Sequence, residues 1–527
     1  MARGSNVSTD RHMQTNDITI AQLWDARAAQ DPGHVYCRFE NESWTIGQLD
    51  ERINRVANAL LASGLQKGDR VAVMLPSHPD HVIVIFALAK AGLVRIPVNV
   101  HLKAAALDFV FDRFEPQALI ADDAYAGALA PIVERSPGLS VFWRGRDGAG
   151  SLSALVEAGS PLPPPTIVEA DDIIAITPSS GTTGEPKGVL KTDRSLRAGP
   201  MGTLALTGAT AGDVFLLWEP LHHGAGVAVL IAALMQPITL AMVDKFSASQ
   251  FWDQVRRFEV THIHYLGGVL PLLLKQPASP RDRDHKVRMA WGGGCPLDVW
   301  RAFEERFGVS LYEGYGLSEM TTFVTINPEG RLGSCGRPLP FYEVRLLDDE
   351  GVEVGVGEPG EIVVRPLEPG LAFKGYFRME EAGAALVKDG WFSTGDLARK
   401  DEDGFLFYSG RKKDSVRRRG VNISAWEVER IVLTHDDIEE CALIGVPSEM
   451  GDDDLKLFIR ATPGREPAPL DLIRWCESRM PYFQIPRYIE PIDEFPKTPT
   501  QRIKKSDLSR SVSGSFDLEA SGYKIGR

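Results

Sequence analysis

Residues 179–188 read Ser179-Ser180-Gly181-Thr182-Thr183-Gly184-Glu185-Pro186-Lys187-Gly188 and directly follow a short apolar run that is typical of a β-strand. The glycines let the backbone adopt positive φ and approach a ligand closely, while hydroxyls and turned amides donate hydrogen bonds. Lys187 adds a positive charge. The stretch therefore predicts a loop that binds nucleotide phosphates, with a plain surface turn as the alternative. It is not a Walker A loop, because no Gly-Lys-Ser/Thr follows a four-residue spacer.

Length and composition exclude several classes of protein. The chain has 527 residues, more than one hydrophobic core usually supports, so two or more domains are expected. Its net charge of −13 argues against nucleic acid or an anionic membrane as the main partner. Five scattered cysteines without a CxxC pair indicate a reducing compartment, so we expect a cytoplasmic protein. The apolar run 225–235 is too short to cross a bilayer and predicts a buried helix.

The alternation of elements predicts an α/β fold. Helical periodicity over 46–65 and 81–92 alternates with apolar runs at 70–75 and 93–97, which is typical of a helix-covered, largely parallel sheet. Short alternating runs over 341–365 predict a β-rich subdomain. We expect a disordered or vector-derived tail over 1–17, a large N-terminal domain over 18–409 that contains several subdomains, a hinge over 410–413 and a small mobile C-terminal α/β domain over 414–527.

Further motifs lie downstream of the glycine-rich loop. They read Tyr312-Glu313-Gly314-Tyr315-Gly316-Leu317-Ser318-Glu319, then Trp391-Phe392-Ser393-Thr394-Gly395-Asp396, then Gly410-Arg411. In this order and spacing the motifs resemble the adenylate-forming superfamily, which contains acyl-CoA synthetases, peptide-synthetase adenylation domains and beetle luciferases. The resemblance covers about 18–508.

The resemblance implies a site for ATP or AMP and assigns roles within it. Glu319 is implied to hold Mg²⁺, a hard cation that prefers oxygen ligands, and Asp396 to accept hydrogen bonds from the ribose hydroxyls. Arg411 supports ribose and phosphate, and Tyr315 stacks on adenine, with a core tyrosine as the alternative. The full implied nucleotide set is Ser179, Ser180, Gly181, Thr182, Thr183, Gly184, Lys187, Gly293, Gly294, Cys295, Glu313, Gly314, Tyr315, Gly316, Ser318, Asp396, Arg411 and Arg502.

The run Pro220-Leu221-His222-His223-Gly224 resembles the acyl-pocket motif of the same superfamily. His223 is implied to act near the substrate carboxylate, although a lone histidine can equally be structural. Ala225, Cys295 and Gly316 are implied to form small pocket walls, which leaves room for a bulky or long acid. We expect no arginine or lysine to point into this region, which disfavours a dicarboxylate or amino-acid substrate.

The C-terminal part is implied to rotate between two half-reactions. Lys413 lies at the hinge position, Gly420 lets pantetheine pass close to the backbone, and the basic run that begins at Arg417 can bind CoA phosphates. A solvated charged face is the alternative for these arginines. The sequence of residues 418–429 is most similar to the carnitine/crotonobetaine-CoA ligase branch. This similarity does not identify the acid that the enzyme activates.

One position departs from the superfamily pattern. The resemblance places a catalytic lysine where this chain has Arg502, and Gln501 stands where the pattern has glycine. Arginine keeps the charge but not the compact ammonium geometry. Three interpretations stay open: Arg502 does the work of the lysine, a neighbour such as Lys504 replaces it, or adenylation is slowed.

These observations predict an AMP-forming carboxylic acid:CoA ligase that uses ATP, Mg²⁺ and CoA, with Lys187, His223, Glu319 and Arg502 as catalytic residues. Because we expect a single small C-terminal domain and no carrier domain, free CoA is favoured over tethered pantetheine. The alternatives are a stand-alone adenylating enzyme with an amine or carrier-protein acceptor, and a nucleotide-binding protein without catalysis. The sequence leaves a homodimer open.

Overall fold

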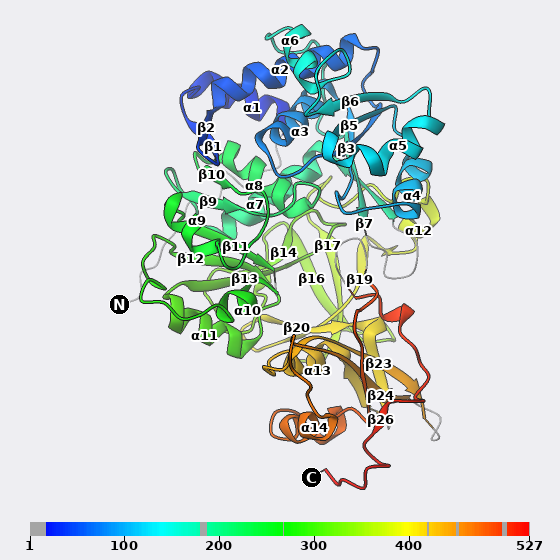
Figure 1. Ribbon diagram of the computed structural model, residues 1–527. Coiled ribbons are helices and arrows are strands. Elements are labelled where there is room, and N and C mark those ends of the chain that lie inside the picture. Colours follow the sequence, from blue (N-terminus) through cyan, green and yellow to red (C-terminus); the bar gives the residue numbers. More distant parts are fainter. Residues whose placement is uncertain are drawn as a thin grey trace. The chain divides into compact units, whose positions relative to one another are not determined.

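The structure is a computed structural model that describes residues 17–179, 187–266, 268–418, 421–448, 453–497 and 503–525 (Figure 1). Over these residues the chain divides into two compact units. The first unit comprises Met1–Glu343 with Arg365–Gly390, and the second comprises Val344–Val364 with Trp391–Arg527. The β-rich segment thus groups with the C-terminal segment, and the predicted hinge over 410–413 stays a prediction.

The first unit contains a mostly parallel sheet whose last strand turns back antiparallel. In spatial order its strands are β6 (Ser140–Arg144), β5 (Ala118–Asp122), β3 (Arg70–Met74), β4 (Val94–Pro97), β7 (Ile173–Ser179) and β8 (Lys187–Thr192). The strands are almost completely buried on both faces at β3, β4 and β5, as a helix-covered parallel sheet requires.

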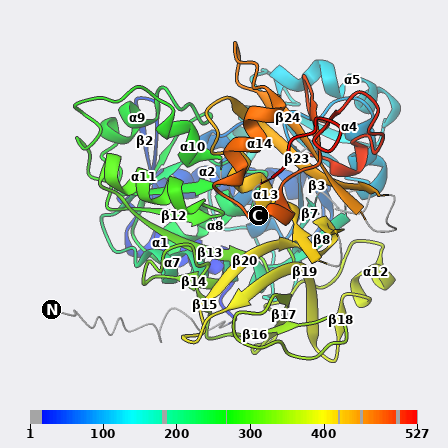
Figure 2. The ribbon, with the colours of Figure 1, turned by 90° about the horizontal axis from the view of Figure 1, so that it is seen from below.

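A second sheet of the same unit is parallel in its centre and antiparallel at its edges. Figure 2 shows β13, β14 and β15 side by side at one edge. In spatial order its strands are β15 (Arg337–Pro338), β14 (Phe323–Asn327), β13 (Ser310–Gly316), β12 (Met289–Gly293), β11 (His262–Leu266), β9 (Val214–Leu217), β10 (Thr239–Met242), β1 (Val35–Phe39) and β2 (Glu42–Thr45).

The helices of the first unit begin and end at recognisable sequence signals. Thr45 and Gln48 form a reciprocal capping box at the start of the second helix, and Gly92 ends the third in the left-handed conformation. The helices are α1 (Ile20–Gln30), α2 (Ile46–Ala62), α3 (Pro79–Ala91), α4 (Ala105–Phe114), α5 (Ala126–Arg135), α6 (Leu152–Ala158), α7 (Asp193–Thr207), α8 (Gly224–Met235), α9 (Phe251–Arg257), α10 (Val269–Leu274), α11 (Leu297–Phe307) and α12 (Glu380–Ala384), with the 3-10 turn η2 (Asp123–Tyr125) and the short strand β18 (Val387–Lys388).

The predicted buried apolar helix is confirmed as α8, where residues such as Leu230, Ile231 and Ala232 are at most 1% exposed. These residues join the main core of the unit, which also takes in α2, α3 and β3. In the part of the chain that the structure describes, no helix is both long enough and apolar enough to cross a membrane.

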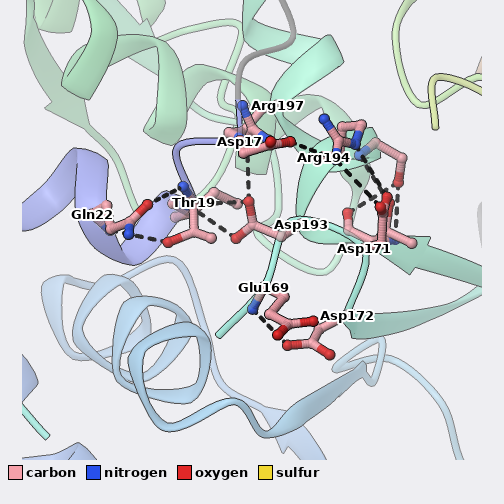
Figure 3. Close-up of polar contacts among 12 residues, drawn as sticks. Asp17, Thr19, Gln22, Glu169, Asp171, Asp172, Asp193, Arg194 and Arg197 are labelled. Atoms are coloured by element: carbon pink, nitrogen blue, oxygen red, sulfur yellow. Dashed lines mark hydrogen bonds and ion pairs between the residues drawn. The ribbon is translucent and has the colours of Figure 1, made fainter. Parts of the chain in front are cut away.

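A buried polar network fixes the N-terminal segment to α7 (Figure 3). Both carboxylate oxygens of Asp193 accept from the backbone N–H of Ile20, at 3.0 and 3.2 Å. Arg197 donates to the same carboxylate through Nε at 3.0 Å, and Arg194 pairs with Asp17 and Asp171. The start of α1 is therefore anchored to the helix that follows β8.

The second unit begins with the predicted β-rich segment, whose strands form an antiparallel group: β16 (Tyr342–Leu347), β17 (Gly360–Pro366), β19 (Trp391–Lys400) and β20 (Leu406–Arg411). The rest of the unit is α/β, as expected. Its elements are η3 (Lys412–Asp414), β21 (Ser415–Arg418), β22 (Val421–Ser424), α13 (Ala425–Val432), β23 (Ile438–Pro447), β24 (Asp453–Ala461), α14 (Pro469–Glu477), η4 (Tyr482–Gln484), β25 (Tyr488–Pro491), η5 (Lys505–Asp507) and β26 (Phe516–Asp517). Strands β23 to β26 form its main sheet, in chain order.

Candidate active site

The predicted phosphate loop connects the strands of a hairpin. β7 ends at Ser179 and β8 begins at Lys187, and these residues pair directly across the antiparallel ladder. The strand expected before the loop is thereby confirmed. Residues 180–186, which include Ser180, Gly181, Thr182, Thr183 and Gly184, and the side chain of Ser179 lie outside the described part of the structure.

A chain of contacts joins Lys187 to Glu319 through a tyrosine that the sequence analysis did not identify. The Nζ of Lys187 lies 4.8 Å from the centroid of the Tyr376 ring, which is a cation–π distance. The Tyr376 hydroxyl donates to Oε1 of Glu319 at 2.8 Å, and the N–H of Phe373 donates to the Glu319 carbonyl at 2.8 Å. Burial and the Glu319 charge raise the pKa of Tyr376, so this hydroxyl stays a donor.

The Glu319 carboxylate fits the predicted magnesium site. It is half-buried, and one of its oxygens accepts from Tyr376. Among the described residues, no hydrogen bond or ion pair occupies the other carboxylate oxygen. A fixed carboxylate with one uncommitted oxygen suits a hard cation that also binds phosphate oxygens. That Glu319 holds Mg²⁺ stays a prediction.

Lys191 is a second lysine of β8, and it contacts the turn that carries Glu319. Its side chain is 3% exposed. The Nζ donates to Oγ1 of Thr321 at 2.7 Å and to the carbonyl of Ser318. Thr321 adopts a left-handed φ of 64°, so the turn is tightly constrained. Burial lowers the pKa of Lys191 to about 7, and the nearby Glu319 charge partly offsets this.

Glu313 connects residues 293–295, a glycine-containing strip of the implied nucleotide set that we call the adenine strip, to the next strand. Its Oε1 accepts from the N–H of Cys295 at 2.6 Å and from the Tyr265 hydroxyl at 3.1 Å. Gly293 and Gly294 directly precede Cys295 in the chain. Gly294 has a φ of 81°, a conformation that favours glycine. The 293–295 strip therefore lies beside the 313–316 motif, and Glu313 is buried between them.

The other predicted residues of β13 and of the following turn are placed as follows. Tyr315 is 8% exposed, so most of its ring is covered by protein. At Gly316 a Cβ would lie 2.3 Å from the carbonyl oxygen of Thr322, so a side chain cannot be accommodated there. At Gly314 a Cβ would meet the Phe323 ring at 2.5 Å. Ser318 lies exposed in the turn. Adenine stacking by Tyr315 stays a prediction.

The predicted acyl-pocket motif (residues 220–224) lies at the start of α8. His223 is the residue before the helix, and its ring lies 4.9 Å from that of His222. Ala225 is half-buried in the first turn of the helix, whereas Cys295 is 4% exposed in the adenine strip. Arg95 lies beside this motif, because it donates through Nη1 to the Leu221 carbonyl at 3.0 Å. The expectation that no arginine or lysine points into the acyl pocket stays a prediction.

In the second unit, Asp396 and Arg411 are direct partners on neighbouring strands. They pair across β19 and β20, and the Arg411 Nε lies 3.1 Å from Oδ1 of Asp396. Tyr408, which the sequence analysis missed, donates its hydroxyl to the same oxygen at 3.2 Å. Asp396 is 4% exposed, so the arginine and the tyrosine hold its carboxylate in place.

The remaining predicted residues lie further along the second unit. Lys413 is exposed in the 3-10 turn directly after β20. Arg417 belongs to β21, but its side chain, Gly420 and Arg502 lie outside the described part of the structure. Arg418 is 8% exposed and bonds Asp454 and the carbonyls of Phe483 and Ile485, so this arginine of the basic run is structural.

Lys504, the neighbour considered as a substitute for Arg502, is described. Its Nζ is 3.8 Å from Asp507, and its side chain is 44% exposed. Lys497 and Ile503 pair across an antiparallel bridge, so Lys504 directly follows this bridge in the chain. The choice between the two cations stays a prediction.

Comparison with known proteins identifies the chain's relatives. The family model described as AMP-binding enzyme matches residues 24–377, and the model described as AMP-binding enzyme C-terminal domain matches residues 427–502. A crotonobetaine/carnitine-CoA ligase from Citrobacter koseri is 31% identical over 93% of this chain and 98% of its own length.

Solved structures show the same fold. ATP-bound MatB from Rhodopseudomonas palustris is 27% identical, with a TM-score of 0.82, over 92% of this chain and 97% of that one. An anthranilate CoA ligase, AuaEII, solved with anthranoyl-AMP, gives a TM-score of 0.85 at 24% identity over 95% of this chain and 98% of that one. The predicted α/β architecture and the resemblance to the adenylate-forming superfamily are both confirmed.

Proposed function

Because the chain belongs to the AMP-binding enzyme family and is an ATP-dependent carboxylic acid:CoA ligase, we propose that Glu319 and Lys187 act on the phosphate end of ATP. The reaction first joins the acid to AMP with release of pyrophosphate. It then transfers the acyl group to CoA and releases AMP. ATP, Mg²⁺ and CoA are therefore the cofactor and co-substrates of this enzyme.

The contact chain from Lys187 through Tyr376 to Glu319 is the observation that carries this proposal. It fixes a cation and a carboxylate in one place before any ligand arrives. In phosphoryl and adenylyl transfer, catalysis comes mainly from holding the reactants in line and from charges that need no reorganisation. Mg²⁺ held by Glu319 would neutralise phosphate charge. Lys187 directly follows the glycine-rich sequence at the start of β8, and its ammonium can donate to a phosphate oxygen.

We propose that Asp396 holds the ribose. Its carboxylate is buried and oriented by Arg411 and Tyr408, so it presents acceptors in a fixed direction, as two neighbouring hydroxyl donors need. Arg411 has further N–H donors beyond the one that faces Asp396. The proposed roles of His223 beside the substrate carboxylate, of Arg502 in adenylation, and of Arg417 and Gly420 towards CoA rest on the resemblance and on their positions in the chain.

Glu319→Gln tests the proposal most directly, with Glu329→Gln as the matched control. Glu329 is exposed and pairs with Arg337 in the same unit. Acid-dependent exchange of pyrophosphate into ATP should fall at least about a hundredfold in Glu319→Gln, the usual effect of losing one preorganised charge contact. The control should keep wild-type exchange. Equal pyrophosphate-exchange activity in the two variants would show that Glu319 does not belong to the active site.

We also propose that the enzyme is cytoplasmic. All five cysteines are buried free thiols, which is usual for proteins of a reducing compartment. A homodimer stays a prediction, and sedimentation of the purified enzyme measures it.

A further inference from the structure

Arg95 is a buried cation with very few protein partners. It lies on β4 and is 5% exposed. A guanidinium offers five N–H donors, yet among the described residues its side chain has a single hydrogen bond, from Nη1 to the Leu221 carbonyl. No carboxylate of the described residues pairs with it. Burying a charge without a counter-charge is strongly unfavourable, so this arrangement calls for an explanation.

The ionisable groups around Arg95 are histidines, which do not neutralise it. His81 is 1% exposed and its Nε2 has no hydrogen-bond partner among the described residues. Burial, and then the Arg95 charge, lower the pKa of His81 to about 3. Burial and the neighbouring cationic groups lower the pKa of His222 to about 2. Both rings are therefore neutral at physiological pH, and Arg95 supplies the permanent charge of the group.

Arg95 also faces a small internal cavity. The other lining side chains are apolar and include Phe86 of α3, Ile174 of β7, and Val227 and Ile231 of α8. The free volume is about 20 Å³, enough for one water molecule or the end of a small polar group. Because α8 starts directly after His223, the cavity lies one to two helical turns from the acyl-pocket motif.

We infer that Arg95 determines substrate specificity by binding a second anionic group, such as a distal carboxylate, at the far end of the acid that the enzyme activates. This inference rests on the proposed function. A ligand anion supplies the missing counter-charge, and the guanidinium fork matches carboxylate geometry.

The inference separates this chain from the relatives it resembles. Crotonobetaine and carnitine, named for the relatives, carry a quaternary ammonium group. A buried guanidinium beside the acyl-pocket motif would repel that group, because like charges in a site of low dielectric interact strongly. The second charged group of this enzyme's acid is therefore expected to be negative.

The test compares matched pairs of acids on the wild-type enzyme and its variants. Unbranched dicarboxylates from succinate to suberate are assayed for ATP-dependent CoA thioester formation against the monocarboxylates of equal length, and crotonobetaine is added as the cationic acid. We expect the best dicarboxylate to exceed its monocarboxylate partner at least tenfold in kcat/KM. A wild type that prefers the monocarboxylate at every length, or that prefers crotonobetaine, overturns the inference.

Arg95→Met supplies the second arm, with Arg301→Met as control. Arg301 is an exposed arginine on α11. In Arg95→Met the dicarboxylate preference should fall at least about tenfold, so that it disappears, while the monocarboxylate partner is spared. An equal loss for both acids would show that Arg95 only supports the Leu221 carbonyl, and it would overturn the inference. If Arg95→Met does not fold, Arg95→Lys takes its place, because it keeps the charge but loses the fork.

Calorimetric titration of the wild type and Arg95→Met with the same dicarboxylates, in the presence of AMP, gives a readout without turnover. Dicarboxylate binding that depends on Arg95 supports the inference even if no thioester forms, in which case only the proposed function fails. Equal dicarboxylate affinity in both proteins overturns the inference alone.

Discussion

The Nζ of Lys191 donates to Oγ1 of Thr321 across 2.7 Å, and the same ammonium donates to the carbonyl of Ser318. The lysine therefore spans the turn that carries Glu319, from the residue before it to the second residue after it. Glu319 itself is held from the other side by Tyr376. The position of this carboxylate thus depends on a strand, a turn and a distant loop that meet only in the folded chain.

Lys191→Met should slow adenylation without unfolding the protein. It removes two hydrogen bonds that hold the Glu319 turn, each worth about 1–3 kcal/mol when a charged donor is involved. A loss of about 10- to 100-fold in pyrophosphate exchange is expected. Because the Ser318 carbonyl and the Thr321 hydroxyl lose their donor, thermal stability should fall moderately while the fold is kept. Thr321→Val, which removes one of the two bonds, should give a smaller loss. Unchanged exchange in both variants would mean that the turn needs no lysine.

Tyr376→Phe should raise the Mg²⁺ concentration needed for half-maximal activity. The change keeps the aromatic ring beneath Lys187 but removes the hydroxyl that orients Glu319. We expect an effect of about tenfold, since one hydrogen bond to a charged group is lost. A Mg²⁺ titration at saturating ATP measures it. Phe373→Tyr, which keeps the backbone N–H bond to Glu319, serves as the control. An unchanged Mg²⁺ requirement in Tyr376→Phe contradicts the proposed orientation.

Asp396→Ala should weaken nucleotide binding far more than acid binding. The proposed ribose hydroxyls lose their acceptor, at a cost of roughly 1.5–3 kcal/mol, or about 10- to 100-fold in affinity for ATP. Tyr408→Phe removes a partner of the carboxylate but keeps its charge, so its effect should be several times smaller. Calorimetry with ATP and with the acid separates the two affinities. Wild-type ATP affinity in Asp396→Ala would show that the ribose lies elsewhere.

Arg502→Ala should suppress adenylation by about a hundredfold and leave thioester formation from preformed acyl-adenylate nearly intact, if the guanidinium stabilises the developing charge. Arg502→Lys should keep or raise adenylation. Rapid-mixing assays of each half-reaction measure the two steps. Full adenylation in Arg502→Ala, combined with its loss in Lys504→Ala, would move the role to Lys504.

The stability of the enzyme should fall as the pH drops below about 6.5, the ordinary pKa of histidine. His81 titrates only near pH 3 in the folded state. Between these values the unfolded chain binds a proton that the folded chain does not, so acid favours unfolding. The slope from this group is at most about 1.4 kcal/mol per pH unit. Urea unfolding of wild type and His81→Gln at pH 5 to 8 tests this. Identical slopes would show that His81 is protonated in the folded protein.

The sequence predicted most of the architecture because local patterns determine it. The helix expected over 225–235 is α8, and the α/β elements expected after residue 414 include α13, α14 and strands β23 to β26. Periodicity and capping act over a few residues, so they can be read without the fold. Contacts such as Lys187 with Tyr376, 189 positions apart, depend on tertiary packing and leave no local signature.

Arg95 and Lys191 show where such prediction ends. Arg95 interrupts the apolar run from Leu93 to Pro97, and Lys191 directly follows the apolar pair Val189 and Leu190. A charge at these strand positions was the available signal. Only the structure reveals that both are buried against backbone carbonyls of predicted site motifs. Burial depends on which elements cover a strand, and the sequence of the strand alone does not specify that.

Strand β8 of the hairpin sets the distance between two lysines. Lys187 and Lys191 are four residues apart, so they share one side of the strand at a separation of about 13 Å. One lysine reaches the tyrosine that holds Glu319, and the other reaches the turn around it. Inserting or deleting one residue between them would turn one ammonium to the opposite side of the sheet. The number of residues between the two lysines is therefore as restricted during evolution as the lysines themselves. In a library of variants, substitutions at Leu190 should be tolerated far better than insertions or deletions in this segment.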